Sequence, residues 1–81
     1  MRDMVEYLAK ALVDNPDQVL VTQREDEDAI IIELRVLSQD MGKVIGKQGR
    51  IAKSIRALVK ASAALDERKK IAVDIMPRDE E

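Results

Sequence analysis

The chain contains neither cysteine nor histidine, and these two absences exclude several kinds of site. Without cysteine there is no disulfide and no thiolate metal site, and a reducing, intracellular setting is favoured. Without histidine the chain lacks the commonest general base and the commonest metal ligand. The remaining candidate groups, including Ser54, Thr22 and Tyr7, form no convincing catalytic constellation. We therefore expect a protein that is not an enzyme and that needs no metal or other cofactor.

Aromatic side chains and long apolar runs are also scarce. There is no Trp or Phe, and Tyr7 is the single aromatic residue. Base-stacking platforms of the kind used by RNA-recognition motifs are therefore nearly excluded. No apolar run approaches the roughly 18 residues of a membrane-spanning helix, and the first residues do not resemble a signal peptide. We expect a cytoplasmic protein that does not enter a membrane.

Positive charge is concentrated in one stretch of an otherwise acidic chain. The net charge is −2, but residues 41–60 contain no acidic residue and carry +6, so the rest of the chain carries −8. The six cations are Lys43, Lys47, Arg50, Lys53, Arg56 and Lys60. The same stretch contains all three glycines, which are Gly42, Gly46 and Gly49. This local pattern favours an anionic partner, although the average charge argues against one.

The spacing of apolar residues predicts three helical segments and three strands. Helical spacing predicts helices over residues 3–13 and 50–65, with a short helical turn over 40–45. Stretches rich in β-branched residues, with alternating apolar positions, predict strands over residues 18–25, 29–37 and 69–76. In the second strand one face is expected to consist of Ile30, Ile32, Leu34 and Val36.

The order of these elements predicts an α+β fold over residues 1–77, with a three-stranded mixed sheet and helices on one face. The acidic link Glu25–Asp28 makes the first two strands an antiparallel hairpin, and we interpret the link as a solvated tip because no calcium-loop spacing is present. The last two strands are joined through helices and should run parallel. Residues 78–81 are expected to form a short, frayed acidic tail.

Two helix starts carry candidate capping residues. Asp3 is the candidate N-cap of the first helix, and Glu6 follows three residues later as its capping-box partner. Ser38 or Asp40 is the candidate cap of the short helical turn.

The segment Gly46-Lys47-Gln48-Gly49 separates the short helical turn from the long helix. Glycine adopts left-handed φ without strain and has no side chain that would keep a ligand away. We expect the turn to leave the first amide N–H groups of the next helix unpaired. Those donors and the positive end of the helix dipole suit a phosphate, and Lys47 and Arg50 add charge at the same place.

Projected at about 100° per residue, the long helix has an apolar side and a basic side. The apolar side contains Ile51, Ala52, Ile55, Leu58 and Val59. The basic side contains Arg50, Lys53, Arg56 and Lys60. A basic stripe that begins at the glycines can follow a sugar–phosphate backbone, with salt-dependent binding. Taken alone, the basic stripe also fits an ordinary solvated helix face, and the glycines also fit an ordinary break between helices. Taken together, beside the apolar residues Val44 and Ile45, the stripe and the glycines favour an anion site.

Two common phosphate-binding motifs do not fit these glycines. A P-loop requires G-x-x-x-x-G-K-[ST] after a strand, but Gly42 to Gly46 is one residue short and Gln48 stands where Ser or Thr would bind magnesium. The dinucleotide fingerprint G-x-G-x-x-G fails because the three glycines are spaced differently.

The segment VIGKQGRIAKSI resembles the V-I-G-x-x-G core of a KH domain. The extra helix and strand before this core resemble the type II arrangement, helix-strand-strand-helix-helix-strand. The length and the segment GKVIGKQGR are similar to the bacterial KhpA family of small RNA-binding proteins. The resemblance implies a groove for about four nucleotides of single-stranded RNA.

Carried onto this sequence, the resemblance implies that the glycine segment clamps the RNA backbone and that apolar neighbours face the bases. The predicted RNA-binding residues are Lys43, Val44, Ile45, Gly46, Lys47, Gln48, Gly49, Arg50, Lys53 and Arg56. The resemblance also implies a homodimer and a second KH-containing partner of the KhpB, Jag or EloR family. It further implies an RNA chaperone or post-transcriptional regulator linked to bacterial cell growth and shape.

A second surface is predicted on the later part of the long helix, which is apolar almost all round. A helix that packs on a sheet needs only one apolar stripe, so the excess favours a dimer contact. The residues proposed for that contact are Leu58, Ala61, Ser62 and Leu65. Alanine chosen only for its helix propensity is the alternative explanation. The first functional interpretation is a non-catalytic RNA binder; the alternative is a protein-interaction adaptor of the same fold that acts mainly through dimerisation.

Overall fold

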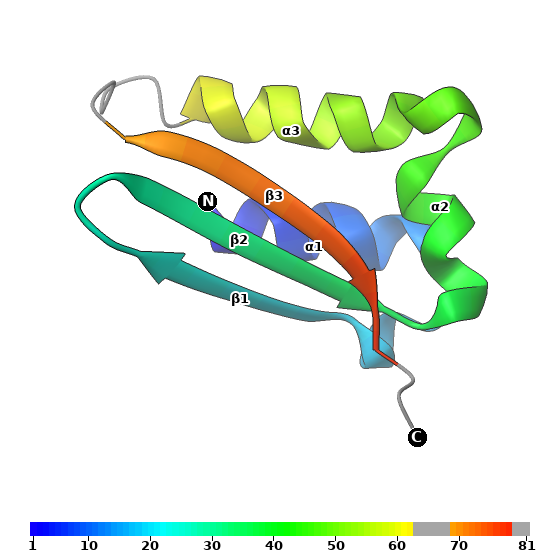
Figure 1. Ribbon diagram of the computed structural model, residues 1–81. Coiled ribbons are helices and arrows are strands. Elements are labelled where there is room, and N and C mark those ends of the chain that lie inside the picture. Colours follow the sequence, from blue (N-terminus) through cyan, green and yellow to red (C-terminus); the bar gives the residue numbers. More distant parts are fainter. Residues whose placement is uncertain (63–68, 79–81) are drawn as a thin grey trace.

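A computed structural model of the chain describes residues 1–62 and 69–78 and confirms the predicted α+β fold (Figure 1). The helices are α1 (Arg2–Leu12), α2 (Met41–Ile45) and α3 (Arg50–Ser62). The strands are β1 (Leu20–Glu25), β2 (Ala29–Val36) and β3 (Lys70–Pro77). Short 3-10 turns precede β1, α2 and α3, at Pro16–Gln18, Ser38–Asp40 and Lys47–Gly49. The first strand begins two residues later than predicted because Pro16–Gln18 forms one of these turns.

The sheet has the order β1-β2-β3, with β1 antiparallel and β3 parallel to β2, as the connections predicted. The central strand alternates between buried and half-buried residues. Its buried residues are the predicted Ile30, Ile32, Leu34 and Val36. They pack against residues of the helices, including Val5 and Ala9 of α1 and Val59 of α3. The helices therefore cover one face of the sheet, and no helix among the described residues covers the opposite face, which is called the open face below (Figure 1).

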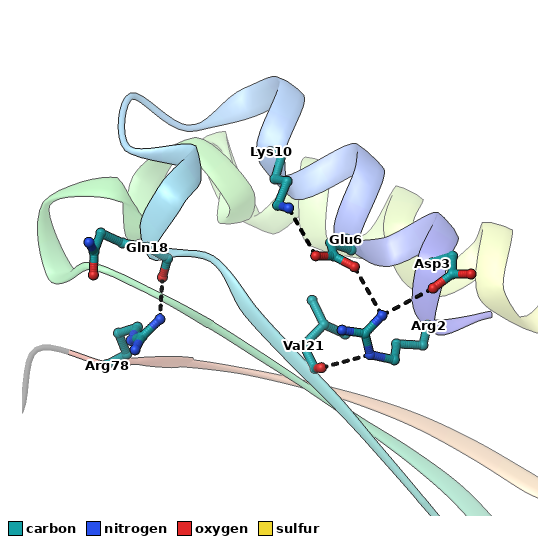
Figure 2. Close-up of polar contacts among 7 residues, drawn as sticks. All are labelled: Arg2, Asp3, Glu6, Lys10, Gln18, Val21 and Arg78. Carbon is teal, nitrogen blue, oxygen red and sulfur yellow. Dashed lines mark hydrogen bonds and ion pairs between the residues drawn. The ribbon is translucent and has the colours of Figure 1, made fainter.

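An arginine from an overlying helix bonds to each outer edge of the sheet. Arg2 Nε donates to the Val21 carbonyl at 2.9 Å on the free edge of β1 (Figure 2). Arg56 Nε donates to the Val73 carbonyl at 3.2 Å on the free edge of β3. Exposed edges with unpaired backbone groups invite pairing with other chains, and a charged side chain across the edge opposes this.

The start of α1 differs from the predicted capping box. The helix begins at Arg2, and no side chain makes a cap hydrogen bond. Asp3 lies inside the first turn, where its carboxylate pairs with the Arg2 guanidinium at 3.0 Å (Figure 2). Glu6 pairs with Lys10 and Arg2 along the helix, at 3.0 and 2.9 Å. These two cations, Lys10 foremost, lower the pKa of Glu6 below its ordinary value.

Asp40 has a different role from the cap that the sequence predicted. Its side chain is 1% exposed and makes no cap hydrogen bond to α2. Its carboxylate instead accepts hydrogen bonds from the backbone N–H of Asp14 at 3.3 Å and of Asn15 at 3.2 Å. It also accepts one from the Asn15 side-chain amide at 3.1 Å. A buried carboxylate thus ties the turn after α1 to the beginning of α2.

The acidic hairpin tip is organised by one of its own carboxylates. Asp26 Oδ1 accepts hydrogen bonds from the backbone N–H groups of Asp28 and Ala29, both at 2.8 Å. These bonds lower the pKa of Asp26, and they form the turn without an Asn-Gly or Asp-Gly pair. Glu25 is paired with Lys69. The tip lies at the end of the sheet opposite α2 (Figure 1).

The chain after β3 is fixed at its first residue. The backbone N–H of Arg78 donates to the Val36 carbonyl at 2.9 Å. Its guanidinium donates to the Gln18 carbonyl at 3.1 Å (Figure 2). Residues 79–81 of the predicted tail lie outside the described residues. Over residues 1–62 and 69–78, no helix has the length and apolar character needed to cross a membrane.

We expect Asp40→Ala to lower the free energy of unfolding by about 2 kcal/mol, because it leaves the part-buried N–H groups of Asp14 and Asn15 without their charged acceptor. Urea unfolding of the variant and of the unmodified chain measures the difference. Glu27→Ala, at the exposed hairpin tip, removes the same charge and should change stability little. Equal effects of the two substitutions would contradict the structural role of Asp40.

Candidate nucleic-acid interface

The segment between α2 and α3 has a left-handed backbone at three of its four residues. Gly46 has φ 76° and ψ 176°, Gln48 has φ 57°, and Gly49 has φ 75°. The Gly46 N–H still closes α2 by donating to the Gly42 carbonyl at 2.9 Å. The segment Gly46–Gly49, called the glycine loop below, is therefore a sharp, defined break between two helices rather than a fluctuating linker.

The two loop glycines are required for different reasons. The φ and ψ angles of Gly46 fall in a region that is essentially restricted to glycine. In addition, a Cβ atom on Gly46 would lie 2.7 Å from Ile51 Cγ1 of α3. Gly49 needs glycine only for its positive φ, because a Cβ there would meet nothing within 4 Å. The contact of Gly46 with Ile51 thus fixes how α3 leaves the loop.

The free amide groups lie earlier in the chain than the sequence predicted. The N–H of Gly49 donates to the Gly46 carbonyl, and the N–H of Arg50 donates to the Lys47 carbonyl. Among the described residues, the N–H groups of Lys47 and Gln48 make no backbone hydrogen bond. The two amides inside the loop are therefore candidate phosphate donors, whereas the N–H of Arg50, the first residue of α3, is already paired.

The basic residues of α3 lie on its solvent-facing side, as the projection predicted. Arg50, Lys53, Arg56 and Lys60 are all exposed. Ala52, Ile55 and Val59 are buried on the opposite side. Leu58 was predicted to share that apolar side, but its side chain is 48% exposed. The Ser54 hydroxyl donates to the Arg50 carbonyl at 3.0 Å, which uses its proton within the helix.

A hollow lies between the basic side of α3 and the free edge of β3. It has a volume of about 220 Å³ and is lined by Arg56 and Lys60 of α3 and by residues 71–74 of β3. The bond from Arg56 to Val73 crosses this hollow. The backbone N–H groups of Lys70 and Arg78 point toward β2, where they donate hydrogen bonds. Backbone groups alternate in direction along a strand, so those of Ile71, Val73 and Ile75 point to the free edge.

The structure brings most of the predicted RNA-binding residues onto one surface. The glycine loop leads into Arg50, Lys53 and Arg56, and this ridge borders the hollow beside β3; the whole surface is called the basic groove below. Sequence analysis missed the β3 edge, although a parallel strand that follows the long helix could have indicated it.

Three predicted RNA-binding residues lie outside the basic groove. Val44 is fully buried in the core, so its side chain does not reach a ligand. Lys43 is exposed, and its ammonium lies 3.9 Å from the Asp14 carboxylate, at the turn after α1. Ile45 is half-buried and packs against the core.

The family model for the KhpA/KhpB KH domain matches residues 2–75 of the chain. The chain belongs to this family. The predicted resemblance to a type II KH domain is thereby confirmed. In KH domains the loop between two helices has the sequence pattern G-x-x-G, and here that loop is Gly46–Gly49.

Curated relatives of the family cover nearly the whole chain. A protein of Caldanaerobacter subterraneus subsp. tengcongensis is 59% identical, over 94% of this chain and 100% of its own length. A protein of Clostridium perfringens is 57% identical over the same shares, and one of Halalkalibacterium halodurans is 49% identical over 94% of this chain and 99% of its own. Each is named RNA-binding protein KhpA. No solved structure matches the chain.

The family is one of binding proteins rather than enzymes, which confirms the prediction that the chain is not an enzyme. Among the residues that the structure describes, no group of three acidic side chains is arranged to hold a metal ion.

We expect Gly46→Ala to destabilise the KH domain more than Gly49→Ala. The Gly49 variant bears only the cost of a left-handed alanine, about 1–2 kcal/mol. The Gly46 variant adds overlap with Ile51, which typically costs about 1–3 kcal/mol more. Urea unfolding of both variants measures the difference. Equal destabilisation would contradict the close packing of Gly46 against α3.

Proposed function

We propose that the chain binds single-stranded RNA in the basic groove, without catalysing a reaction. The observation that carries the proposal is the continuity of this surface. Loop amides without backbone partners lead directly into exposed cations of α3, and these border the free edge of a strand. The names of the relatives, all RNA-binding proteins, support the same function.

Each part of the basic groove suits a different part of a nucleotide. The amides of Lys47 and Gln48 and the cations of Arg50 and Lys53 suit phosphate oxygens. The backbone groups at the β3 edge are neutral donors and acceptors, which suit base edges. From Arg50 to Lys60 the helix rises about 15 Å, which limits the site to a few nucleotides.

Arg56 has a distinct place in the proposed site. Its Nε is bonded to the Val73 carbonyl, so the guanidinium is fixed across the hollow. The Nη groups make no other hydrogen bond among the described residues, and they remain available to RNA. A fixed guanidinium loses less conformational entropy on binding than a free one.

The acidic hairpin limits where RNA lies. It is at the far end of the sheet from α2, so its carboxylates are remote from the glycine loop (Figure 1). A polyanion is repelled from the hairpin end and attracted to the loop end. The proposed RNA path therefore occupies the loop end of the groove.

The cellular role belongs to the same proposal. We propose one RNA-binding module over residues 1–77 that works in the cytoplasm as an RNA chaperone or post-transcriptional regulator. The family resemblance supports a link to bacterial growth and shape. Because the matching family model describes both KhpA and KhpB, it also supports a second KH-containing protein as partner.

A homodimer through α3 is the second candidate, and it is the basis of the adaptor alternative. Leu58, Ala61 and Ser62 are exposed on α3, and Leu65 lies outside the described residues. Ser62 contacts Met4 of α1 at 3.7 Å, so this surface continues toward α1. Tyr7 of α1 is 74% exposed and adds apolar area. Exposed apolar residues together with small residues suit a close contact between two helices.

We expect RNA affinity to fall steeply with salt and to be lost in the double variant Gly46→Asp and Gly49→Asp. Fluorescence anisotropy with a short, unstructured RNA measures both effects. Lys53→Ala should reduce the slope of log affinity against log salt by about 0.7, the loss of one phosphate contact.

Lys10→Ala, on α1, is the matched control because it changes the net charge equally but lies outside the basic groove. It should leave the salt slope unchanged. Equal weakening by the Lys10 and Lys53 variants would show that only net charge matters. The adaptor alternative would be favoured by two results together: the unmodified chain binds no RNA, and the double glycine variant still binds its protein partner.

We expect sedimentation at micromolar concentration to show a dimer that Leu58→Asp dissociates, because the substitution places a charge in the proposed contact. Lys53→Asp, on the opposite side of α3, should leave the dimer intact. A monomer in the unmodified chain, or equal effects of both variants, would contradict the contact.

A further inference from the structure

The open face of the sheet carries a second hollow, which is separate from the basic groove. Arg35 of β2 lies opposite Leu20 of β1 and opposite Met76 of β3. Cross-strand partners project from the same face, and this row is on the face that the helices leave open. With Pro77 and Arg78 the row lines a hollow of about 390 Å³, called the sheet shelf below.

Among residues 1–62 and 69–78, the Arg35 guanidinium lacks a close carboxylate partner. Glu33 is the nearest acid in this part of the chain, at 3.9 Å, which is the outer limit of an ion pair. Glu33 is already engaged, because it accepts from Thr22 at 3.2 Å and from Arg24 at 3.3 Å. The other contact of Arg35 is to the Met76 sulfur at 3.4 Å, and a thioether is a weak acceptor.

The surroundings of Arg35 are apolar and fixed. Leu20 is 38% exposed and offers apolar area to a ligand. Met76 is half-buried, and methionine adapts to varied apolar partners. Arg78 is fixed by its bond to the Gln18 carbonyl, which places a second guanidinium at the end of the shelf. The shelf thus combines apolar walls with two guanidinium groups.

We propose that the sheet shelf docks a protein segment that carries one carboxylate beside an apolar side chain. The carboxylate would pair with Arg35 and Arg78, since a guanidinium binds a carboxylate with two parallel hydrogen bonds. The apolar side chain would cover Leu20 and Met76. The shelf lies on the face opposite the helices, so a protein partner there leaves the basic groove free.

RNA fits the shelf poorly. The next row along the strands consists of Thr22, Glu33 and Asp74, about 7 Å away. Its two carboxylates repel a chain of phosphates that extends past Arg35, whereas a peptide with a single carboxylate avoids them. Charge complementarity therefore favours a protein segment over a nucleic acid.

The test uses the pentapeptide acetyl-Gly-Leu-Glu-Leu-Gly-amide and its Gln-for-Glu analogue, titrated into the full chain and followed by NMR. We expect the Glu peptide to shift the Leu20 and Met76 methyl signals and the Arg35 Nε–H signal, and the Gln peptide to bind at least fivefold more weakly. Arg35→Gln should cause a similar loss. Lys53→Gln, in the basic groove, removes the same charge and should leave the affinity unchanged.

The proposal is overturned by equal binding of the two peptides, by shifts confined to the basic groove, or by stronger shifts of the shelf signals with a short RNA. Residues 79–81 are Asp-Glu-Glu and carry carboxylates of their own. The titration is therefore repeated on a chain that ends at Arg78, where we expect equal or tighter peptide binding. Absence of binding to both chains also overturns the proposal. Urea unfolding checks that Arg35→Gln is folded, and Arg35→Lys should retain part of the affinity.

Discussion

The contact between Gly46 and Ile51 is the constraint on which the candidate site depends. A left-handed backbone ends α2, and the missing side chain lets Ile51 of α3 pack directly against the turn. This packing directs α3 along β3, and it leaves the loop amides of Lys47 and Gln48 without backbone partners. One glycine therefore contributes both to the packing of the basic helix and to the geometry of the proposed phosphate donors.

Three arginines lie in different regions of the surface of this small domain. Arg2 and Arg56 each extend from a helix to a carbonyl at one edge of the sheet. Arg56 therefore both joins α3 to the sheet and lines the basic groove. Arg35 lies on the opposite face of β2 from the buried Leu34 and Val36, in a row with Leu20 and Met76. The surface thus presents a row of cations along α3 and the edge of β3, and a mixture of apolar and charged residues on the open face of the sheet.

Much of the fold was predictable because local patterns and connectivity agree. The alternation in β2 predicted its buried face, and the helical crossover predicted the parallel pairing of β3. Predictions from local sequence rules were less accurate where a side chain makes contacts with residues that are distant in the sequence. Asp40 resembled a cap, but the backbone amides of a distant turn use its carboxylate. Leu58 was assigned both to the apolar side of α3 and to a second contact surface; it is exposed beside the core, and no sequence pattern reveals where a core ends.

The most direct measurement for the proposed function is amide chemical-shift mapping with a short single-stranded RNA at low ionic strength. If the loop amides donate hydrogen bonds to the phosphates, the largest amide shift changes fall on Lys47 and Gln48. Smaller changes follow at Arg50, Lys53 and the edge residue Val73. The acidic hairpin at Asp26–Asp28 stays unchanged in the same spectra. Shifts that miss the glycine loop, or that spread evenly over all basic residues, contradict the account.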